Sequence, residues 1–281
     1  MCYGWKLCAL KQLELFSLKK NIMIKRLIVV LMVLGITGCD GGPSNKIVWE
    51  KDGAEMVWIP ELFIPAKFKK ERVYDRIGNP VTKSVKVSEP VKIDAFYMDC
   101  TEVTVGQFKK FLRATAHRYN TGYWEQVYRY SPTDEHPMIY VSWHDAISYC
   151  NWAGKRLPTE VEWDRAARGG LVDKEYPWGD DLRMSRDYAN YDGTGNKDKW
   201  DDQTAPVGRF APNGYGLYDI IGNVWEWCAD SYDDDQDNRV LRGGSWDNLS
   251  FGLRITDRSF HLPNDADNYF GFRCVAELSE F

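Results

Sequence analysis

Polar and apolar positions follow a helical period in three short segments, and each segment begins with a capping signal. Thr104 precedes Gln107 by three residues, as in a capping box, and the apolar Phe108, Phe111 and Leu112 then fall on one helix face. The pattern therefore predicts a helix after Thr104 that serves as scaffold. Two further helices are predicted after Ser142 and Thr159, ending at Gly154 and at Gly169 with Gly170.

Strand patterns lie before these helices. Residues 55–60 and 85–98 are rich in strand-forming residues and partly alternate apolar with polar positions. Pro90 has no backbone donor, so it predicts an edge position or a bulge in the second run. From residue 171 onward only short aromatic runs between turn signals remain. This pattern predicts a loop-rich globule without long helices.

The N-terminal region resembles an export signal. Lys25 and Arg26 precede the apolar run of residues 27–34, as in the basic and apolar parts of a secretory signal. We expect translation to start at Met23 and residues 1–38 to be removed. Small residues lead directly to Cys39, which resembles a lipoprotein cleavage site. Cys39 is therefore predicted to carry the lipid anchor, with acyl groups such as palmitate.

A transmembrane anchor is the alternative for this region, but its apolar stretch is shorter than the ~20 residues that cross a bilayer. In a bacterial envelope the lipidated chain would face the periplasm. Asp40 would retain it at the inner membrane if the source uses that signal. Residues 39–54 are predicted to be a lipidated polar tether, and residues 55–281 the folded domain.

The charge balance excludes one class of partner. The chain has 36 Lys and Arg against 41 Asp and Glu. Residues 1–38 hold six of these bases and one acid, so 30 bases and 40 acids remain after processing. A net charge near −10 argues against nucleic acid, because phosphate binding needs a basic face.

Aromatic and cysteine content complete the composition. The 12 Trp, 16 Tyr and 12 Phe indicate a globule held together by aromatic packing. Besides Cys39, four cysteines follow the signal region, an even number in an exported and oxidising setting. At least one disulfide is therefore expected. The four are Cys100, Cys150, Cys228 and Cys274.

Ordered motifs in the second half of the chain resemble one known family, that of the sulfatase-modifying-factor domain and the formylglycine-generating enzymes. The match runs from about residue 55 to 277. It implies the compact α+β fold of this family, which is related to C-type lectins. The motifs that carry it are Tyr149 to Trp163, Ala166 to Gly170, Tyr176 to Gly179, Ala205 to Gly208, Pro212 to Tyr218, Gly222 to Trp227, Arg242 to Trp246 and Gly271 to Cys274.

The family's oxidases keep a pair of cysteines after the Arg-Gly-Gly-Ser block. Two soft thiolates select Cu(I), and one can exchange with a substrate thiol. Here the corresponding stretch, Asp247 to Arg254, contains no cysteine. The resemblance therefore predicts a chain without copper and without the family's oxidase mechanism, and we assign no catalytic residue.

The resemblance also implies two calcium sites, because hard oxygen ligands on a turn-rich backbone suit Ca²⁺. The alternative is that these acids only accept backbone N–H bonds. The first set matches Asn190, Tyr191, Asp198 and Trp200, and the second matches Asp219, Gly222, Val224 and Glu226.

A disulfide and a ligand groove follow from the same resemblance. Cys150 and Cys274 match a family disulfide, whose loop of over a hundred residues would contribute roughly 4–5 kcal/mol in the chain-entropy model. Cys100 and Cys228 either pair or stay free. The family's peptide groove maps to Ser245, Trp246, Arg254 and Arg258.

Two functions are compatible with this sequence. The first is a lipid-anchored, non-copper binding or accessory module, whose partner is a periplasmic or extracellular protein segment or a glycan. The second is an exported oxidoreductase that acts on a peptide or siderophore-type substrate by a different pocket chemistry. Loss of both thiols with the scaffold retained favours the first.

Overall fold

The computed structural model describes residues 45–66, 68–74, 80–86, 88–193, 200, 202–233 and 237–277. Contacts divide the chain into residues 1–43 and 44–281, and every described residue belongs to the second unit. The predicted signal, Cys39 and the first part of the tether lie outside the described residues. Within the described ranges, no helix is long and apolar enough to cross a membrane.

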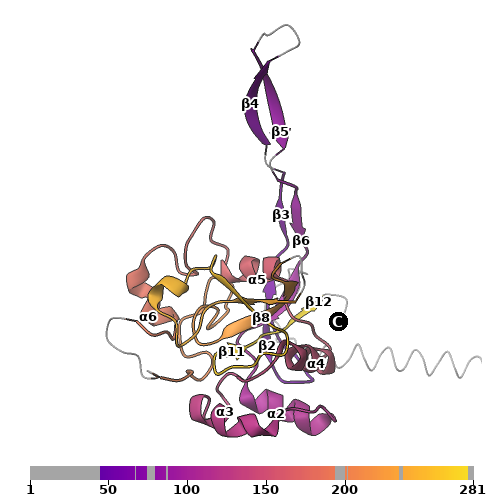
Figure 1. Ribbon diagram of the computed structural model, residues 1–281, viewed down its shortest axis with the longest axis vertical. Helices are drawn as coiled ribbons and strands as arrows, with labels where there is room; N and C mark the ends of the chain where they lie inside the picture. The colour runs from indigo at the N-terminus through magenta and orange to yellow at the C-terminus, as the bar shows by residue number, and fades with distance from the viewer. Residues whose placement is uncertain are drawn as a thin grey trace, which may run out of the picture. The chain divides into compact units, whose positions relative to one another are not determined.

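Two four-stranded sheets form the centre of the domain (Figure 1). The first sheet is antiparallel throughout, and in the second sheet β11 runs parallel to β8 while the other pairs are antiparallel. In spatial order the first sheet contains β1 (Lys46–Val48), β2 (Glu55–Ile59), β7 (Phe96–Asp99) and β12 (Val275–Glu277). The second contains β10 (Arg258–His261), β9 (Arg239–Arg242), β8 (Trp225–Ser231) and β11 (Phe270–Gly271).

Two further antiparallel pairs lie between β2 and β7 in the chain. β3 (Leu62–Ile64) pairs with β6 (Val91–Ile93), and β4 (Phe68–Tyr74) pairs with β5 (Pro80–Lys86). The strand predicted over residues 85–98 is therefore divided among β5, β6 and β7. Pro90 lies directly before β6, where its missing N–H costs no ladder bond.

All three predicted helices are present, and each begins with a capping box. In α2, for example, the Thr104 hydroxyl accepts from the Gln107 backbone N–H at 3.2 Å. α3 was not predicted, because it starts without a side-chain cap. The helices are α2 (Val105–Ala114), α3 (Trp124–Tyr130), α4 (Trp143–Ala153), α5 (Glu160–Ala167) and α6 (Ser185–Tyr188), with 3-10 turns η1 (Thr121–Tyr123), η2 (Leu182–Met184) and η3 (Ser250–Gly252).

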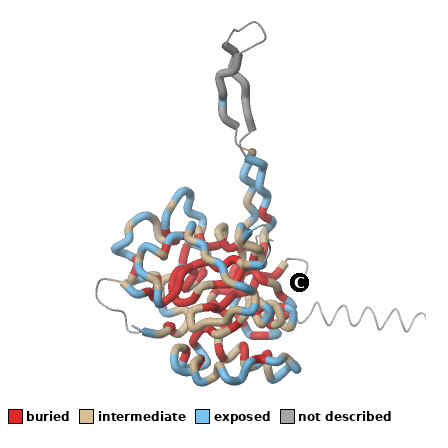
Figure 2. Tube along the Cα trace, in the orientation of Figure 1, coloured by how far each residue is buried: buried red, intermediate tan, exposed pale blue. Residues whose placement is uncertain are grey.

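The hydrophobic core lies on and between these sheets, where the buried residues concentrate (Figure 2). One cluster joins the first sheet to α5 and the segment before β8. A second joins α2, α3 and α4 to β8 and β11. Trp163 of α5 and Trp227 of β8 are fully buried, one in each cluster. Aromatic packing therefore holds both halves of the core, as the composition predicts.

A buried ion pair links the two sheets. Arg273, which lies between β11 and β12, donates to both carboxylate oxygens of Glu226 in β8 at 2.7–2.9 Å. Its remaining donors reach the carbonyls of Asp99, Cys100 and Tyr218 at 2.9–3.2 Å. Neither charged side chain is more than 1% exposed. Burial by itself would lower the pKa of Arg273, but the Glu226 charge outweighs it and raises that pKa.

We predict that Arg273→Met destabilises the fold by about 3–5 kcal/mol, because it leaves Glu226 buried and unpaired. Urea unfolding measures this free energy. Arg254→Met is the matched control, since Arg254 lies at the surface, 3.7 Å from Glu175, and such pairs contribute about 0–1 kcal/mol. Adding Glu226→Gln to Arg273→Met should recover part of the loss. An Arg273 variant as stable as the control would contradict this role.

Candidate functional site

The turn before β8 has an unusual backbone. Asp219, Gly222 and Asn223 have positive φ angles of 53°, 80° and 60°. At Gly222 a Cβ would lie 2.4 Å from the Asn190 carbonyl oxygen, so only glycine fits this close approach. The left-handed turn thus brings the chain against Asn190.

Asn223 fixes this turn to four other segments. Its backbone N–H donates to the Asn190 carbonyl at 2.8 Å, and its side-chain oxygen accepts from the Ala205 N–H at 2.8 Å. Its side-chain nitrogen donates to Glu102 at 2.9 Å. The Asn223 carbonyl accepts from the Trp246 N–H at 2.9 Å. Asn223 is fully buried, so this network positions the turn from inside the protein.

Two buried carboxylates beside this turn each keep an oxygen without a partner. Asp219 accepts from the Gly208 N–H through Oδ2 at 2.6 Å, while its Oδ1 has no hydrogen bond. Glu102 accepts from Asn223 through Oε1, while its Oε2 has none. Both residues are at most 2% exposed. A buried acceptor without a donor is costly, so these two atoms indicate a place for a cation.

The pKa values of these carboxyl groups are raised, chiefly because the groups are buried. Burial raises the pKa of Asp219 to about 6. Burial, and then the charge of Asp219, raises the pKa of Glu102 well above its usual value. Burial also raises the pKa of Glu226, although Arg273 opposes the shift. Three carboxylates therefore face one guanidinium group, and a divalent cation would neutralise the remainder.

This geometry fits part of the second predicted calcium set. Asp219 offers a free oxygen, but both Glu226 oxygens accept from Arg273, and Oε2 also accepts from Trp163 Nε1 at 2.8 Å. Across the described ranges, no group of three or more His, Cys, Asp or Glu side chains converges as a metal site. Asp219 and Glu102 are thus the side chains that could hold a cation, with backbone carbonyls of the turn.

The first predicted calcium set is described only in part. Asn190 is buried, and its side-chain nitrogen donates to the Gln203 carbonyl at 3.0 Å. The Tyr191 carbonyl accepts from Arg186 at 2.7 Å. The Trp200 ring contacts Phe210, and Asp198 lies outside the described residues. This set stays a prediction.

The predicted groove residues lie in two different environments. Ser245 is buried, and its hydroxyl donates to Asn248 at 2.9 Å. The Trp246 indole N–H donates to the Asn268 carbonyl at 3.1 Å, and its ring stacks on Tyr130. Trp246 is therefore the member of the set that joins the Asn223 turn to aromatic side chains.

The two groove arginines are each paired with an acid. Arg258 donates twice to Glu160, at 2.8 Å for each bond, and lies over the Tyr232 ring. Arg254 is 3.7 Å from Glu175. These pairs neutralise the positive charge that an anionic ligand would need.

The four cysteines of the described ranges are all buried thiols. Burial raises the pKa of Cys100 to about 11 and that of Cys228 well above its usual value. The sulfur atoms of Cys150 and Cys274 lie 3.2 Å apart, close enough for the predicted disulfide to form after a small movement. That pairing stays a prediction. Burial makes all four thiols poor nucleophiles, and for Cys100 and Cys228 the raised pKa adds to this effect.

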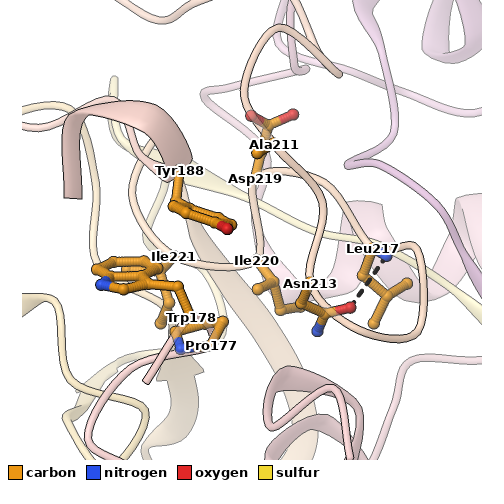
Figure 3. A pocket seen from close by; sticks show the side chains of 9 residues that line it. All are labelled: Pro177, Trp178, Tyr188, Ala211, Asn213, Leu217, Asp219, Ile220 and Ile221. Atoms are coloured by element: carbon orange, nitrogen blue, oxygen red, sulfur yellow. Dashed lines mark hydrogen bonds between the residues drawn. The ribbon is translucent and has the colours of Figure 1, made fainter. Parts of the chain in front are cut away.

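A small pocket is lined in part by Asp219. Its volume is about 10 Å³, room for about one water molecule. In Figure 3 the Asp219 carboxylate points away from the Trp178 ring of this pocket. None of the predicted groove residues lines it. The lining residues are Pro177, Trp178, Tyr188, Ala211, Asn213, Leu217, Asp219, Ile220 and Ile221.

Sequence reasoning missed Glu102. It stands between the β7 strand and the Thr104 cap, beside the buried Val103. Asp99, Thr101 and Thr104 are polar neighbours in the same stretch, so no local pattern indicated that Glu102 is buried. The two oxygen atoms without partners could be found only from the structure.

Comparisons with known proteins identify the family. A model described as the sulfatase-modifying factor enzyme 1-like domain matches residues 50–278. The chain is similar to the inactive C-alpha-formylglycine-generating enzyme 2 of Bos taurus, at 47% identity over 152 residues, which cover 50% of each chain. It is 43% identical over 169 residues to the formylglycine-generating enzyme of Thermomonospora curvata, covering 50% of this chain and 56% of that one. The chain thus spans about half the length of these curated relatives.

A solved structure supports the same assignment. The structure of PvdO from Pseudomonas aeruginosa matches 85% of this chain and 100% of its own, with a TM-score of 0.60 and 25% identity. This likeness confirms the predicted α+β sulfatase-modifying-factor fold, which is related to C-type lectins. With the family model matching most of its length, the chain belongs to the sulfatase-modifying-factor family of the formylglycine-generating enzymes.

Proposed function

We propose that this chain is a non-catalytic binding or accessory module of its family, acting on a protein segment or a glycan in the cell envelope. The thiol-free stretch after Trp246 carries the proposal, since residues 247–270 contain no cysteine. The four thiols in the described part of the chain are buried, so none offers a substitute for an exposed reactive pair. The 47% identity to a bovine relative named as inactive also supports it.

An assay for thiol oxidation tests this proposal. The purified chain is incubated with a cysteine-containing peptide, Cu(I), a reductant and oxygen, and mass spectrometry measures conversion of cysteine to formylglycine. We expect none above the protein-free control, with the Thermomonospora curvata enzyme as the active reference. Turnover that Cys228→Ser abolishes would overturn the proposal. Turnover on other peptide or phenolic groups would instead favour the oxidoreductase alternative.

We also propose that calcium binds between Asp219 and Glu102, with carbonyls of the turn before β8. The support is the pair of buried oxygen atoms without partners, and Ca²⁺ prefers such hard oxygen ligands. The ion would neutralise the buried carboxylates and brace the loop that meets Asn190. Copper has no corresponding support, because soft thiolates are absent from this site.

Calcium removal should lower the melting temperature, and the effect should depend on pH. Asp219 has a pKa raised from 3.8 to about 6. In chelator, the folded state therefore binds this proton more tightly than the unfolded state, so stability falls as pH rises from about 4 to about 6. Calcium should restore it above pH 6, by about 3 kcal/mol at 100 times the Kd.

Differential scanning calorimetry with EGTA or calcium measures both effects. Asp219→Asn and Glu102→Gln should each remove the calcium response, whereas Glu135→Gln should keep it, because Glu135 is exposed and pairs with Arg209. Melting that is insensitive to EGTA in the unaltered chain would rule out a structural calcium ion here.

We propose further that lipid on Cys39 anchors the chain to a bacterial envelope, facing the periplasm. The basic and apolar residues before Cys39 support this, and Asp40 would favour the inner membrane. Mass spectrometry of the membrane fraction should find an acylated peptide that begins at Cys39. Cys39→Ser should leave the precursor unprocessed. A wild-type chain that retains residues 23–38 with Cys39 unmodified would contradict the proposed lipid anchor.

A further inference from the structure

The residues between β2 and β7 differ in charge from the rest of the chain. Residues 62–93 contain eight Lys and Arg against three Asp and Glu. Of the 30 bases and 40 acids expected in the processed chain, 22 bases and 37 acids therefore lie elsewhere. This segment is basic, while the remainder of the chain is strongly acidic.

This basic segment forms two successive two-stranded ribbons, β3 with β6 and β4 with β5 (Figure 1). In the described part of the chain, neither ribbon joins either of the four-stranded sheets. A two-stranded ribbon is only marginally stable by itself in water. A surface that binds one face of the β4–β5 ribbon would therefore stabilise it.

The strand register separates the charges of the β4–β5 ribbon between its two faces, because alternate positions of a strand lie on the same face. One face carries Lys70, Arg72 and Lys86 and has no acid. The opposite face carries an acid, Glu71, which is paired in register with Lys83. We call the first face the basic face. Its other positions are Phe68, Tyr74, Pro80, Thr82 and Ser84.

Exposed apolar residues lie in the neighbouring β3–β6 ribbon. Phe63 is 64% exposed, Ile64 39% and Val91 38%. Ile64 is paired in register with Val91. Apolar side chains beside basic ones suit the headgroup layer of a bilayer, which takes up both. An acidic protein would attract the basic residues but would leave these apolar residues unexplained.

We propose that the basic face of the β4–β5 ribbon binds the anionic phospholipid headgroups of a membrane surface. Each Lys or Arg close to such a surface adds to the attraction, and salt weakens it. The acidic remainder of the chain would be repelled by the same surface, so the ribbon would be the part that binds. This inference goes beyond the proposed binding function, because the ribbon belongs neither to the predicted groove nor to the calcium site.

Acetylation of lysines on lipid nanodiscs tests this proposal. The full chain is inserted into discs of phosphatidylcholine alone or of phosphatidylcholine with phosphatidylglycerol, and mass spectrometry measures how fast a water-soluble reagent acetylates each lysine. In the anionic discs we expect Lys70 and Lys86 to react about fivefold more slowly than in the neutral discs. Lys69 and Lys83 of the opposite face, and the exposed Lys110 of α2, should keep their rates. Added salt should remove the protection.

Two charge reversals locate the effect. Arg72→Glu should remove most of the protection of Lys70 and Lys86. Lys69→Glu makes the same change of charge on the opposite face of the same strand, and it should retain the protection. Equal rates in both kinds of disc, equal protection of the two faces, or an equal loss in the two variants would overturn the proposal. Protection that is already present in neutral discs and grows with protein concentration would also overturn it, and would assign the basic face to a second copy of this chain.

These outcomes are independent of the other proposals. The apolar residues 27–34 would hold an unprocessed chain in the disc, so a chain without lipid on Cys39 can be tested in the same way. A chain without oxidase activity whose Lys70 is not protected would keep the non-catalytic role and lose the membrane contact. A chain that oxidises thiols and still shows the protection would keep the membrane contact alone.

Discussion

The buried pair of Arg273 and Glu226 is the interaction on which the two-sheet architecture depends. Glu226 belongs to β8 in the second sheet. Arg273 also bonds the carbonyls of Asp99, the last residue of β7 in the first sheet, and of Cys100 directly after it. Strand ladders hold each sheet internally, but they do not join one to the other. A guanidinium can, because its rigid fork donates in several directions at once. The Glu226 oxygens accept in return, so the charge is matched where water is absent.

Matching that pair leaves the neighbouring acids without a counterion. Arg273 is committed to Glu226, and Asp219 and Glu102 each retain a buried oxygen that nothing bonds. In a low-dielectric interior such groups either take up a proton or hold a cation. The ion pair that links the two sheets thus leaves Asp219 and Glu102 without a counterion beside the turn.

Sequence signals within a few residues correctly predicted three helices, because helix starts are determined by local interactions. The capping boxes at Thr104 and Thr159 placed two helices correctly, because a cap is made by residues three positions apart. The family motifs around Glu226 predicted the fold. No local pattern showed that Glu226 would pair with Arg273, 47 residues away, or that Glu102 would accept a hydrogen bond from Asn223, 121 residues away. Strand β8 was also missed, because its three buried residues, Glu226 to Cys228, are consecutive and do not follow an alternating pattern.

Burial separates the two kinds of acidic group in this protein. Asp219 and Glu102 are almost fully buried, so their negative charge must be neutralised within the fold. Only a ligand as small as an ion could reach them. Asp247 is exposed beside Trp246, so its charge needs no internal partner and remains accessible from outside. Arg254 and Arg258 are exposed too, but each is paired with a glutamate. The groove that the family resemblance predicted is therefore electrically asymmetric, with accessible negative charge at its aromatic end and neutralised arginines elsewhere.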